Sequence, residues 1–143
     1  MSAADFLDTN VLVYMFDRQD EAKQVVARQC VSEALSSGEG VISFQVVQET
    51  LNALTQKARQ PLPAAEAREL LHAVLVPLWR VQPSAGLYER AQTVRQQQGF
   101  SFYDSLIVAA ALEAGCKRLI TEDLQHGQKV GALRIENPFR QGA

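Results

Sequence analysis

Short apolar runs alternate along the chain with longer segments in which apolar and polar residues recur at helical spacing. Such runs, when bounded by glycine or polar residues, predict buried strands. Five runs have this character, and they cover residues 5–8, 40–43, 77–81, 118–121 and 133–135.

The segments between these runs predict helices, because their apolar residues recur about once a turn. Pro63 is placed to open one helix, Pro61 stops another, and Gly99 and Gly115 follow the ends of two more. Strands that alternate with helices predict a parallel sheet covered by helices on both faces. The expected fold class is therefore α/β with a five-stranded parallel sheet. The predicted helices cover residues 11–16, 20–35, 45–58, 64–75, 84–98 and 101–114.

Composition narrows the possible functions of the chain. Its 143 residues suit one domain, and no repeat or linker divides residues 1–143. The formal net charge of −2 excludes nucleic-acid binding by bulk positive charge, so any such contact has to be local or metal-mediated. Cys30 and Cys116 are too few for a disulfide scaffold or a zinc cluster, so two reduced thiols are expected. With no secretory signal and no apolar run long enough for a membrane span, we expect a cytoplasmic protein.

Three acidic residues lie where the predicted strands end. Asp8 ends the first strand, Asp123 follows the fourth, and Asp104 lies in the first turn of the helix that leads into the fourth. Open parallel sheets build their sites outside the carboxyl ends of the strands, at the point where strand order reverses. These three side chains are therefore candidates for one site.

Each candidate also has a purely structural interpretation. Asp104 stands three residues after Ser101, which is the spacing of a helix capping box. Asp8 could begin a turn, and Asp123 could belong to an ordinary solvated loop. Glu49 lies on the polar stripe of its helix, so a solvated helix face is its simplest explanation.

If the four acids meet in one site, their mutual repulsion predicts a bound cation. Two carboxylates about 5 Å apart repel by roughly 3 kcal/mol, so four that meet would be penalised by on the order of 10 kcal/mol. Either some of them keep a proton and have raised pKa values, or a divalent cation lies among them. Oxygen ligands without Cys or His favour Mg²⁺ or Mn²⁺, which is the chemistry that a phosphodiester hydrolase needs.

Four short motifs occur in order along nearly the whole chain. They are Phe6-Leu7-Asp8-Thr9-Asn10-Val11-Leu12, Gln48-Glu49, Phe102-Tyr103-Asp104-Ser105-Leu106 with its alanine-rich continuation, and Leu119-Ile120-Thr121-Glu122-Asp123. In this order they resemble the motifs of the PIN-domain ribonucleases, and especially those of the VapC-type toxins of bacterial toxin–antitoxin pairs. Asn137-Pro138-Phe139 resembles the closing segment of one subgroup.

The resemblance implies a PIN-like domain that acts as a Mg²⁺- or Mn²⁺-dependent endoribonuclease. Glu122 competes with Asp123 as the fourth acid of the site, and Asp123 is preferred because it occupies the T-x-D position of the family. Asn10 is expected either to orient a ligand or to cap a helix. The resemblance also implies an RNA substrate, a cognate antitoxin protein and a homodimer. The residues that it carries over are Asp8, Glu49, Asp104 and Asp123 as catalytic metal ligands, with Thr9, Asn10 and Thr121 as residues that orient them.

His126 and five basic residues each have two possible roles. His126 lies just past Asp123. It could have a functional role, by contacting a phosphate or transferring a proton, or it could be an ordinary surface residue of a loop. Scattered basic side chains either rim a groove for RNA or are simply solvated. They are Lys57, Arg59, Arg68, Arg90 and Arg95.

Three other functions compete with a nuclease. A haloacid-dehalogenase-like phosphatase needs a second acid two residues after the first, and that position is Asn10. A phosphorylation-receiver domain needs adjacent acids after the first strand and a phospho-accepting Asp after the third, where Val81-Gln82-Pro83 stands. A catalytically silent PIN-like interaction module would be expected to have lost acids, whereas all four are present.

Overall fold

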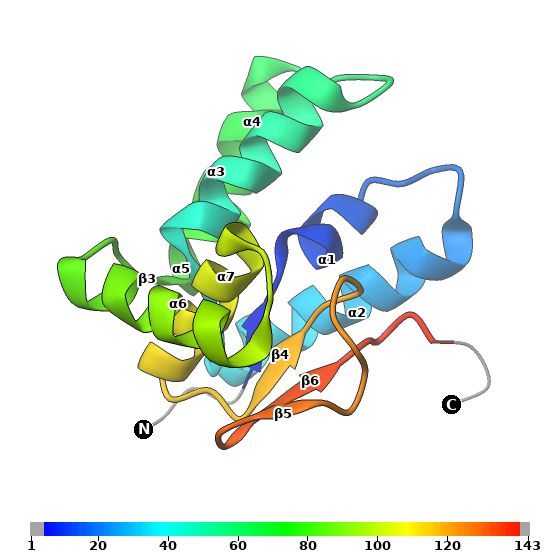
Figure 1. Cartoon of the computed structure of the whole chain (residues 1–143). Coiled ribbons are helices and arrows are strands. Elements are labelled where there is room, and N and C mark those ends of the chain that lie inside the picture. Colours follow the sequence, from blue (N-terminus) through cyan, green and yellow to red (C-terminus); the bar gives the residue numbers. More distant parts are fainter. Residues whose placement is uncertain (1–4, 141–143) are drawn as a thin grey trace.

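The structure is a computed structural model, and it describes residues 5–140 (Figure 1). It contains a six-stranded sheet in the order β3-β2-β1-β4-β6-β5, in which all neighbours are parallel except β5 and β6. The α/β class predicted from the sequence is therefore confirmed. The strands are β1 (Asp5–Leu7), β2 (Gly40–Ser43), β3 (Trp79–Val81), β4 (Arg118–Ile120), β5 (Lys129–Val130) and β6 (Leu133–Glu136).

The five predicted parallel strands are present, and the sheet has a sixth strand that was not predicted. The missed strand, β5, pairs antiparallel with β6 around a turn in which Gly131 has a positive φ. Two residues are too few to show the alternation that marks a strand in sequence. At the other edge of the sheet, Pro77 belongs to a helical turn and β3 begins only at Trp79. Proline is tolerated in the first turn of a helix because its missing N–H is not needed there.

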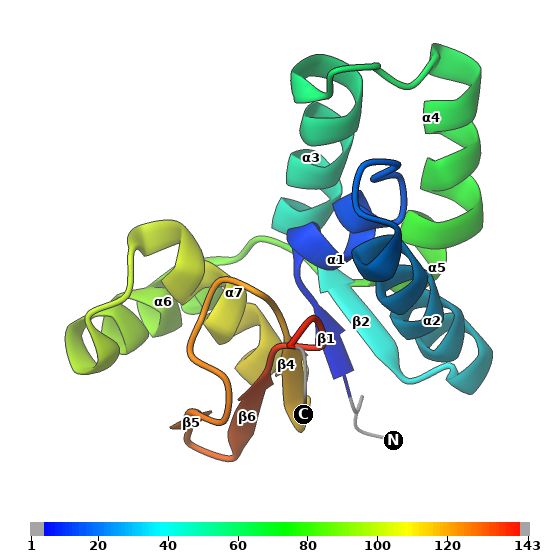
Figure 2. The same cartoon turned by 90° about the vertical axis from the view of Figure 1, so that its right-hand side faces the viewer.

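Helices cover both faces of the sheet, as Figure 2 shows from the side. Helices α6 and α7 pack together on one face, and α1 and α2 pack on the other. Gly38 and Gly99 have positive φ angles and end α2 and α6 in the left-handed conformation that favours glycine. The helices of these two layers are α1 (Thr9–Tyr14), α2 (Glu21–Ser37), α6 (Ala85–Gln98) and α7 (Phe102–Glu113).

A pair of helical segments projects beyond the sheet and forms what we call the helical arm, residues 44–75 (Figure 2). Each segment was predicted as one continuous helix, but each ends in a π-helical turn. The Leu62 N–H donates to the Leu54 carbonyl at 2.9 Å and ties the connection between them to the first segment. The arm consists of α3 (Phe44–Asn52) with η1 (Ala53–Lys57), and α4 (Ala64–Leu70) with η2 (Leu71–Leu75); α5 (Val76–Leu78) then leads into β3.

The strand order reverses beside β1. The chain passes from β1 to β2 and β3 on one side, and returns to add β4 and β6 on the other side. Phe6, Leu7 and Leu119 in the central strands are at most 1% exposed. The Asp8 N–H donates to the Ile120 carbonyl at 3.0 Å, which continues the β1–β4 pairing by one residue. The ends of these two strands therefore lie side by side at the reversal point, where α/β sheets place their binding sites.

The two cysteines are unpaired thiols in the structure. Cys116 is buried and Cys30 is half-buried, and burial raises the pKa of Cys116 to about 12. Both observations agree with the expectation of reduced cysteines. Between residues 5 and 140, no helix combines the length and the apolar character that crossing a membrane requires.

Gly40 and Gly86 provide a matched test of the packing. A Cβ atom on Gly40 would collide with Ala34 of α2, whereas a Cβ on Gly86 meets nothing within 4 Å. We expect Gly40→Ala to lower the free energy of unfolding by about 1–3 kcal/mol. Gly86→Ala should raise it by up to about 1 kcal/mol, because alanine loses less entropy in a helix. Urea denaturation measures both, and equal effects would contradict the described contact between α2 and β2.

Candidate active site

A cavity of about 390 Å³ lies between the helical arm, the start of α7 and the ends of β1 and β4. All four carboxylates proposed from the sequence line this one cavity, although they come from four separate parts of the chain. The lining residues are Asp8, Thr9, Asn10, Val13, Tyr14, Gln45, Glu49, Asn52, Ala53, Lys57, Tyr103, Asp104, Ile107 and Asp123.

Asp8 is the buried acid of the cavity, with 5% of its surface exposed. It is the N-cap of α1, so this helix begins at Thr9 and not at Val11 as predicted. Its carboxylate accepts hydrogen bonds from the Thr9 N–H at 2.7 Å and from the Thr121 hydroxyl at 2.8 Å. Burial raises the pKa of Asp8 to about 7, and the negative charges of Asp123 and Glu49 add to this effect while the two hydrogen bonds oppose it.

Glu49 faces the cavity from the helical arm. Its carboxylate accepts from the Thr9 hydroxyl at 2.9 Å and from the Gln45 amide, one turn earlier in α3, at 3.4 Å. The same Gln45 amide nitrogen donates to the Tyr103 carbonyl at 3.2 Å, which joins the arm to the start of α7. Glu49 is therefore half-buried between two elements and does not lie on a plain solvated face.

Gln45 is a residue of the site that the sequence did not reveal. The hydrophobic pattern of α3 places it on the polar stripe, yet it is only 4% exposed because α7 covers it. Its Oε1 is buried in the cavity wall and has no hydrogen-bond partner among residues 5–140. A buried acceptor without a donor is costly, and the two hydrogen bonds that the Gln45 amide donates offset part of this cost.

Asp104 takes part in the helix cap through its backbone. The Ser101 hydroxyl accepts from the Asp104 N–H at 3.1 Å, as the capping spacing predicts. Its carboxylate lines the cavity and accepts no hydrogen bond from another group in the described part of the chain. The structural and the functional interpretations of Asp104 are thus compatible, because they use different atoms.

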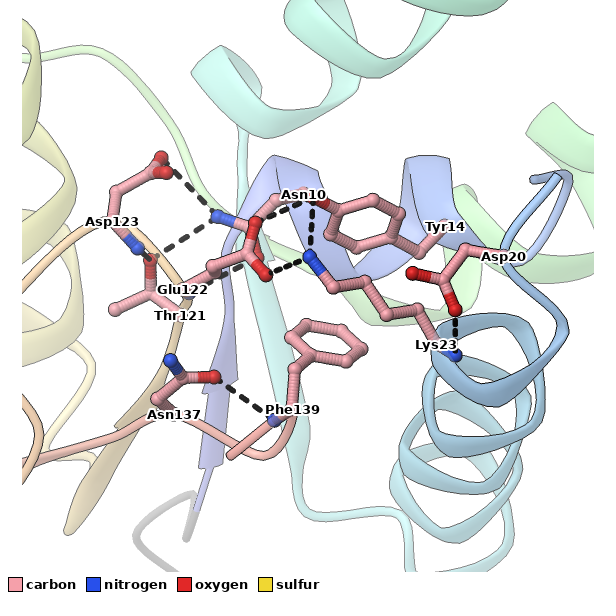
Figure 3. Close-up of polar contacts among 9 residues, drawn as sticks. All are labelled: Asn10, Tyr14, Asp20, Lys23, Thr121, Glu122, Asp123, Asn137 and Phe139. Atoms are coloured by element: carbon pink, nitrogen blue, oxygen red, sulfur yellow. Dashed lines mark hydrogen bonds and ion pairs between the residues drawn. The ribbon is translucent and has the colours of Figure 1, made fainter. Parts of the chain in front are cut away.

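Thr121 organises the loop that carries Asp123 (Figure 3). Its hydroxyl donates to Asp8 and accepts from the Asn10 amide at 3.2 Å and from the Asp123 N–H at 3.0 Å. The Asn10 amide also donates to Asp123 at 3.2 Å, while its oxygen accepts from the Glu122 N–H at 3.2 Å. Asn10 therefore orients the loop after β4 and does not cap α1.

Glu122 turns away from the cavity, and Figure 3 shows it on the opposite side of the loop from Asp123. Its carboxylate pairs with Lys23 at 2.5 Å and accepts from the Tyr14 hydroxyl at 2.5 Å. Burial acts to raise the pKa of Glu122, but these two hydrogen bonds outweigh it and lower the pKa. Glu122 is thus occupied as an ion-pair partner, and this placement favours Asp123 as the acid of the cavity.

Lys23, Tyr14 and Phe139 complete this neighbouring cluster. The Lys23 ammonium lies 4.6 Å from the centre of the Tyr14 ring, and the Tyr14 and Phe139 rings meet edge to face at 4.9 Å. The cluster joins α1, α2, the loop after β4 and the segment after β6. The motif Asn137-Pro138-Phe139 was the only signal of it in the sequence, because its members are far apart along the chain.

Of His126 and the five basic residues, one lines the cavity. The Nδ1 of His126 accepts from the Asn137 N–H at 3.0 Å, so this histidine holds two loops together and does not line the cavity. Of the five basic residues proposed as a rim, Lys57 lines the cavity from the far end of the arm. It brings a positive charge close to the acidic group.

The chemistry of the cavity fits a hydrated divalent cation. No three acidic, histidine or cysteine side chains within residues 5–140 are arranged to hold a metal ion directly, so the tight cluster expected from the sequence is not present. Hydrogen bonds from Thr9, Thr121 and Asn10 fix the positions of three of the carboxylates. Mg²⁺ usually keeps several of its waters, so carboxylates that do not all reach the ion could still bind it through water.

The raised pKa of Asp8 predicts a pH-dependent stability. Between about pH 4 and 7 the folded protein holds a proton that the unfolded chain has released, so stability falls as pH rises and levels off above pH 7. With a chelator present, urea denaturation at pH 5–7 should show a loss of up to about 1.4 kcal/mol per pH unit from this group. Asp8→Asn should remove that slope. An identical slope in the variant would show that Asp8 is not the titrating group.

Comparison with known proteins places this geometry in a family. No curated protein sequence gives a significant match. Several solved structures share the fold at low identity. A toxin–antitoxin complex from Klebsiella pneumoniae has a TM-score of 0.68 at 20% identity, covering 94% of this chain and 98% of that one. VapBC2 from Rickettsia felis, bound to a promoter DNA fragment, has a TM-score of 0.65 at 20% identity with the same coverage.

The third structure is VapC20 from Mycobacterium tuberculosis, described as a sarcin–ricin loop cleaving toxin. Its TM-score is 0.58 at 21% identity, covering 81% of this chain and 87% of that one. Identities this low establish the fold alone. The sequence model of the PIN domain matches residues 6–130, which is most of the chain and includes all four carboxylates of the cavity. This chain therefore belongs to the PIN domain family.

Proposed function

We propose that this protein is a metal-dependent endoribonuclease that uses Mg²⁺ or Mn²⁺ and acts as the toxin of a toxin–antitoxin pair. The observation that carries the proposal is the cavity at the reversal point of the sheet, which gathers Asp8, Glu49, Asp104 and Asp123. Carboxylates that gather in one cavity repel one another unless a cation or protons offset their charge. Membership of the PIN domain family supports nuclease chemistry at this cavity.

The roles of the residues follow from their places in the cavity. Asp8 and Asp104 would bind the cation directly, and Glu49 and Asp123 would bind it through its water molecules. A divalent cation held there polarises a phosphate oxygen and makes water easier to deprotonate. Thr9, Asn10 and Thr121 would orient the carboxylates through their hydrogen bonds, and Lys57 would attract the phosphate backbone.

The choice of RNA and of a protein partner rests on the family. VapC20 is described as a toxin that cleaves the sarcin–ricin loop, and this supports a nucleic-acid substrate for the same fold. The similar structure from Klebsiella pneumoniae is a toxin–antitoxin complex, which supports a cognate antitoxin as a partner of this chain. A homodimer is part of the same proposal.

The competing functions fit the cavity less well. In a haloacid-dehalogenase-like phosphatase the residue two positions after Asp8 is a second acid, whereas Asn10 uses its amide to hold the Glu122–Asp123 loop. A catalytically silent PIN-like module would not need to keep Asp8 buried with a pKa of about 7, because an apolar or amide side chain would be less costly there.

Cleavage of RNA tests the proposal directly. The purified protein should cleave RNA with Mg²⁺ or Mn²⁺ and lose this activity in EDTA. Asp8→Asn and Asp104→Asn should each lower the rate by roughly 100-fold or more, because each removes a charged ligand of the cation. The matched control is Glu113→Gln, which neutralises an exposed acid at the other end of α7. Cleavage by Asp8→Asn at the parent rate would refute the assigned site.

Metal binding can be measured without activity. At pH 7.5, Mg²⁺ or Mn²⁺ should raise the melting temperature of the folded protein, since a ligand that binds only the folded state stabilises it. A cation at about 100 times its Kd would add about 2.7 kcal/mol. Asp8→Asn should abolish this gain and Glu113→Gln should keep it. Equal gains in both variants would place the cation elsewhere.

A further inference from the structure

Two aromatic side chains stand exposed beside the acidic cavity. Tyr103 is 64% exposed and lines the cavity, and its neighbour Phe102 is 36% exposed. Their rings meet edge to face, with centres 5.2 Å apart. The other large exposed apolar side chains in the described part of the chain do not line this cavity. An aromatic ring left in water at the mouth of a site offers a surface for a ligand.

The backbone that carries Tyr103 is held firmly. Tyr103 lies in the first turn of α7, which Ser101 caps, and its carbonyl accepts from the buried Gln45 amide at 3.2 Å. The next residue is Asp104, so the ring and one acid of the cavity share a single fixed turn. A ring on a rigid element loses little entropy when it binds a ligand, which makes it an effective contact.

A second element that lines the cavity supplies a positive charge. Lys57 lines the cavity from the end of the helical arm, while Tyr103 lines it from α7. An acidic cavity repels the phosphate backbone of RNA wherever a cation does not offset its charge. A flat aromatic face on one side and an ammonium on the other would supply binding energy that does not depend on the carboxylates.

From this arrangement, and resting on the proposed nuclease function, we propose that Tyr103 stacks on an unpaired base next to the phosphodiester bond that is cleaved. Bases within a duplex already stack on one another and do not present a face to a protein ring, whereas unpaired bases do. Tyr103 is a substrate-binding residue in this account, and the carboxylates keep the chemistry.

The test compares Tyr103→Ala with Tyr103→Phe, which keeps the ring. Cleavage of a single-stranded oligoribonucleotide is measured with Mn²⁺. Tyr103→Ala should raise KM about 5- to 100-fold with little change in kcat, because stacking binds the ground state and the transition state alike. Tyr103→Phe should resemble the parent. The matched control is Tyr88→Ala, which removes a 40% exposed tyrosine of α6 away from the cavity.

A second readout separates stacking from a structural effect. Oligonucleotides that carry one abasic ribose at successive positions beside the cleavage site should show one position at which the parent loses affinity. Tyr103→Ala should be insensitive to the abasic ribose at that same position, because the contact is already absent. The parent should also cleave the single strand in preference to the same sequence in a duplex, and Tyr103→Ala should lose most of this preference.

The possible results distinguish the two proposals. If the parent cleaves RNA and Tyr103→Ala matches it in KM and in response to every abasic site, the stacking proposal is wrong and the nuclease stands. If the parent cleaves no RNA with either metal, both proposals fall. If Tyr103→Ala changes the mass of the particle in light scattering but leaves RNA kinetics unchanged, Tyr103 contacts a protein, and the stacking proposal is overturned.

Discussion

The burial of one carboxylate at the reversal point of the sheet is the constraint on which the rest of the site depends. Asp8 follows the central strand β1, so its side chain is withdrawn from water by the same packing that forms the core. Its two hydrogen-bond donors, the Thr9 N–H and the Thr121 hydroxyl, offset only part of that cost. Because part of the cost of burying the charge is not offset, a positive charge that enters the cavity would stabilise the ionised form of Asp8.

Hydrogen bonds around Asp8 fix the positions of the other acids of the cavity. Thr121 and Asn10 position the loop of Asp123, and Thr9 holds Glu49 across the cavity. The pair between Lys23 and Glu122 is partly exposed and contributes little to stability by itself. Its importance is geometric, because it fixes the loop from the side away from the cavity.

The sequence predicted those parts of the site that follow from strand order. Asp8, Thr121 and Asp123 could be placed together because the carboxyl ends of adjacent parallel strands meet. Gln45 could not be found, since its burial depends on α7, which is remote in sequence and invisible in the periodicity of α3.

Spacing between the acids was also beyond the reach of the sequence. The expectation of a tight carboxylate cluster considered only the charges, whereas neutral donors such as Thr9 and Asn10 also bind these carboxylates and fix their positions, and no three of them within residues 5–140 form a direct metal site. Strand β5 and the π-helical turns escaped prediction for a different reason. A two-residue strand and a single wide turn leave no period in the pattern of apolar residues.

The edges of the sheet have a consequence for how copies of this chain can associate. One edge is β5, only two residues long and carrying the exposed Lys129, and the other is β3, whose register with β2 shifts. Short, charged or irregular edges are poor templates for the addition of another strand. Growth of the sheet from molecule to molecule is therefore disfavoured, which protects a concentrated solution from fibrous aggregation and leaves helical surfaces as the route to self-assembly.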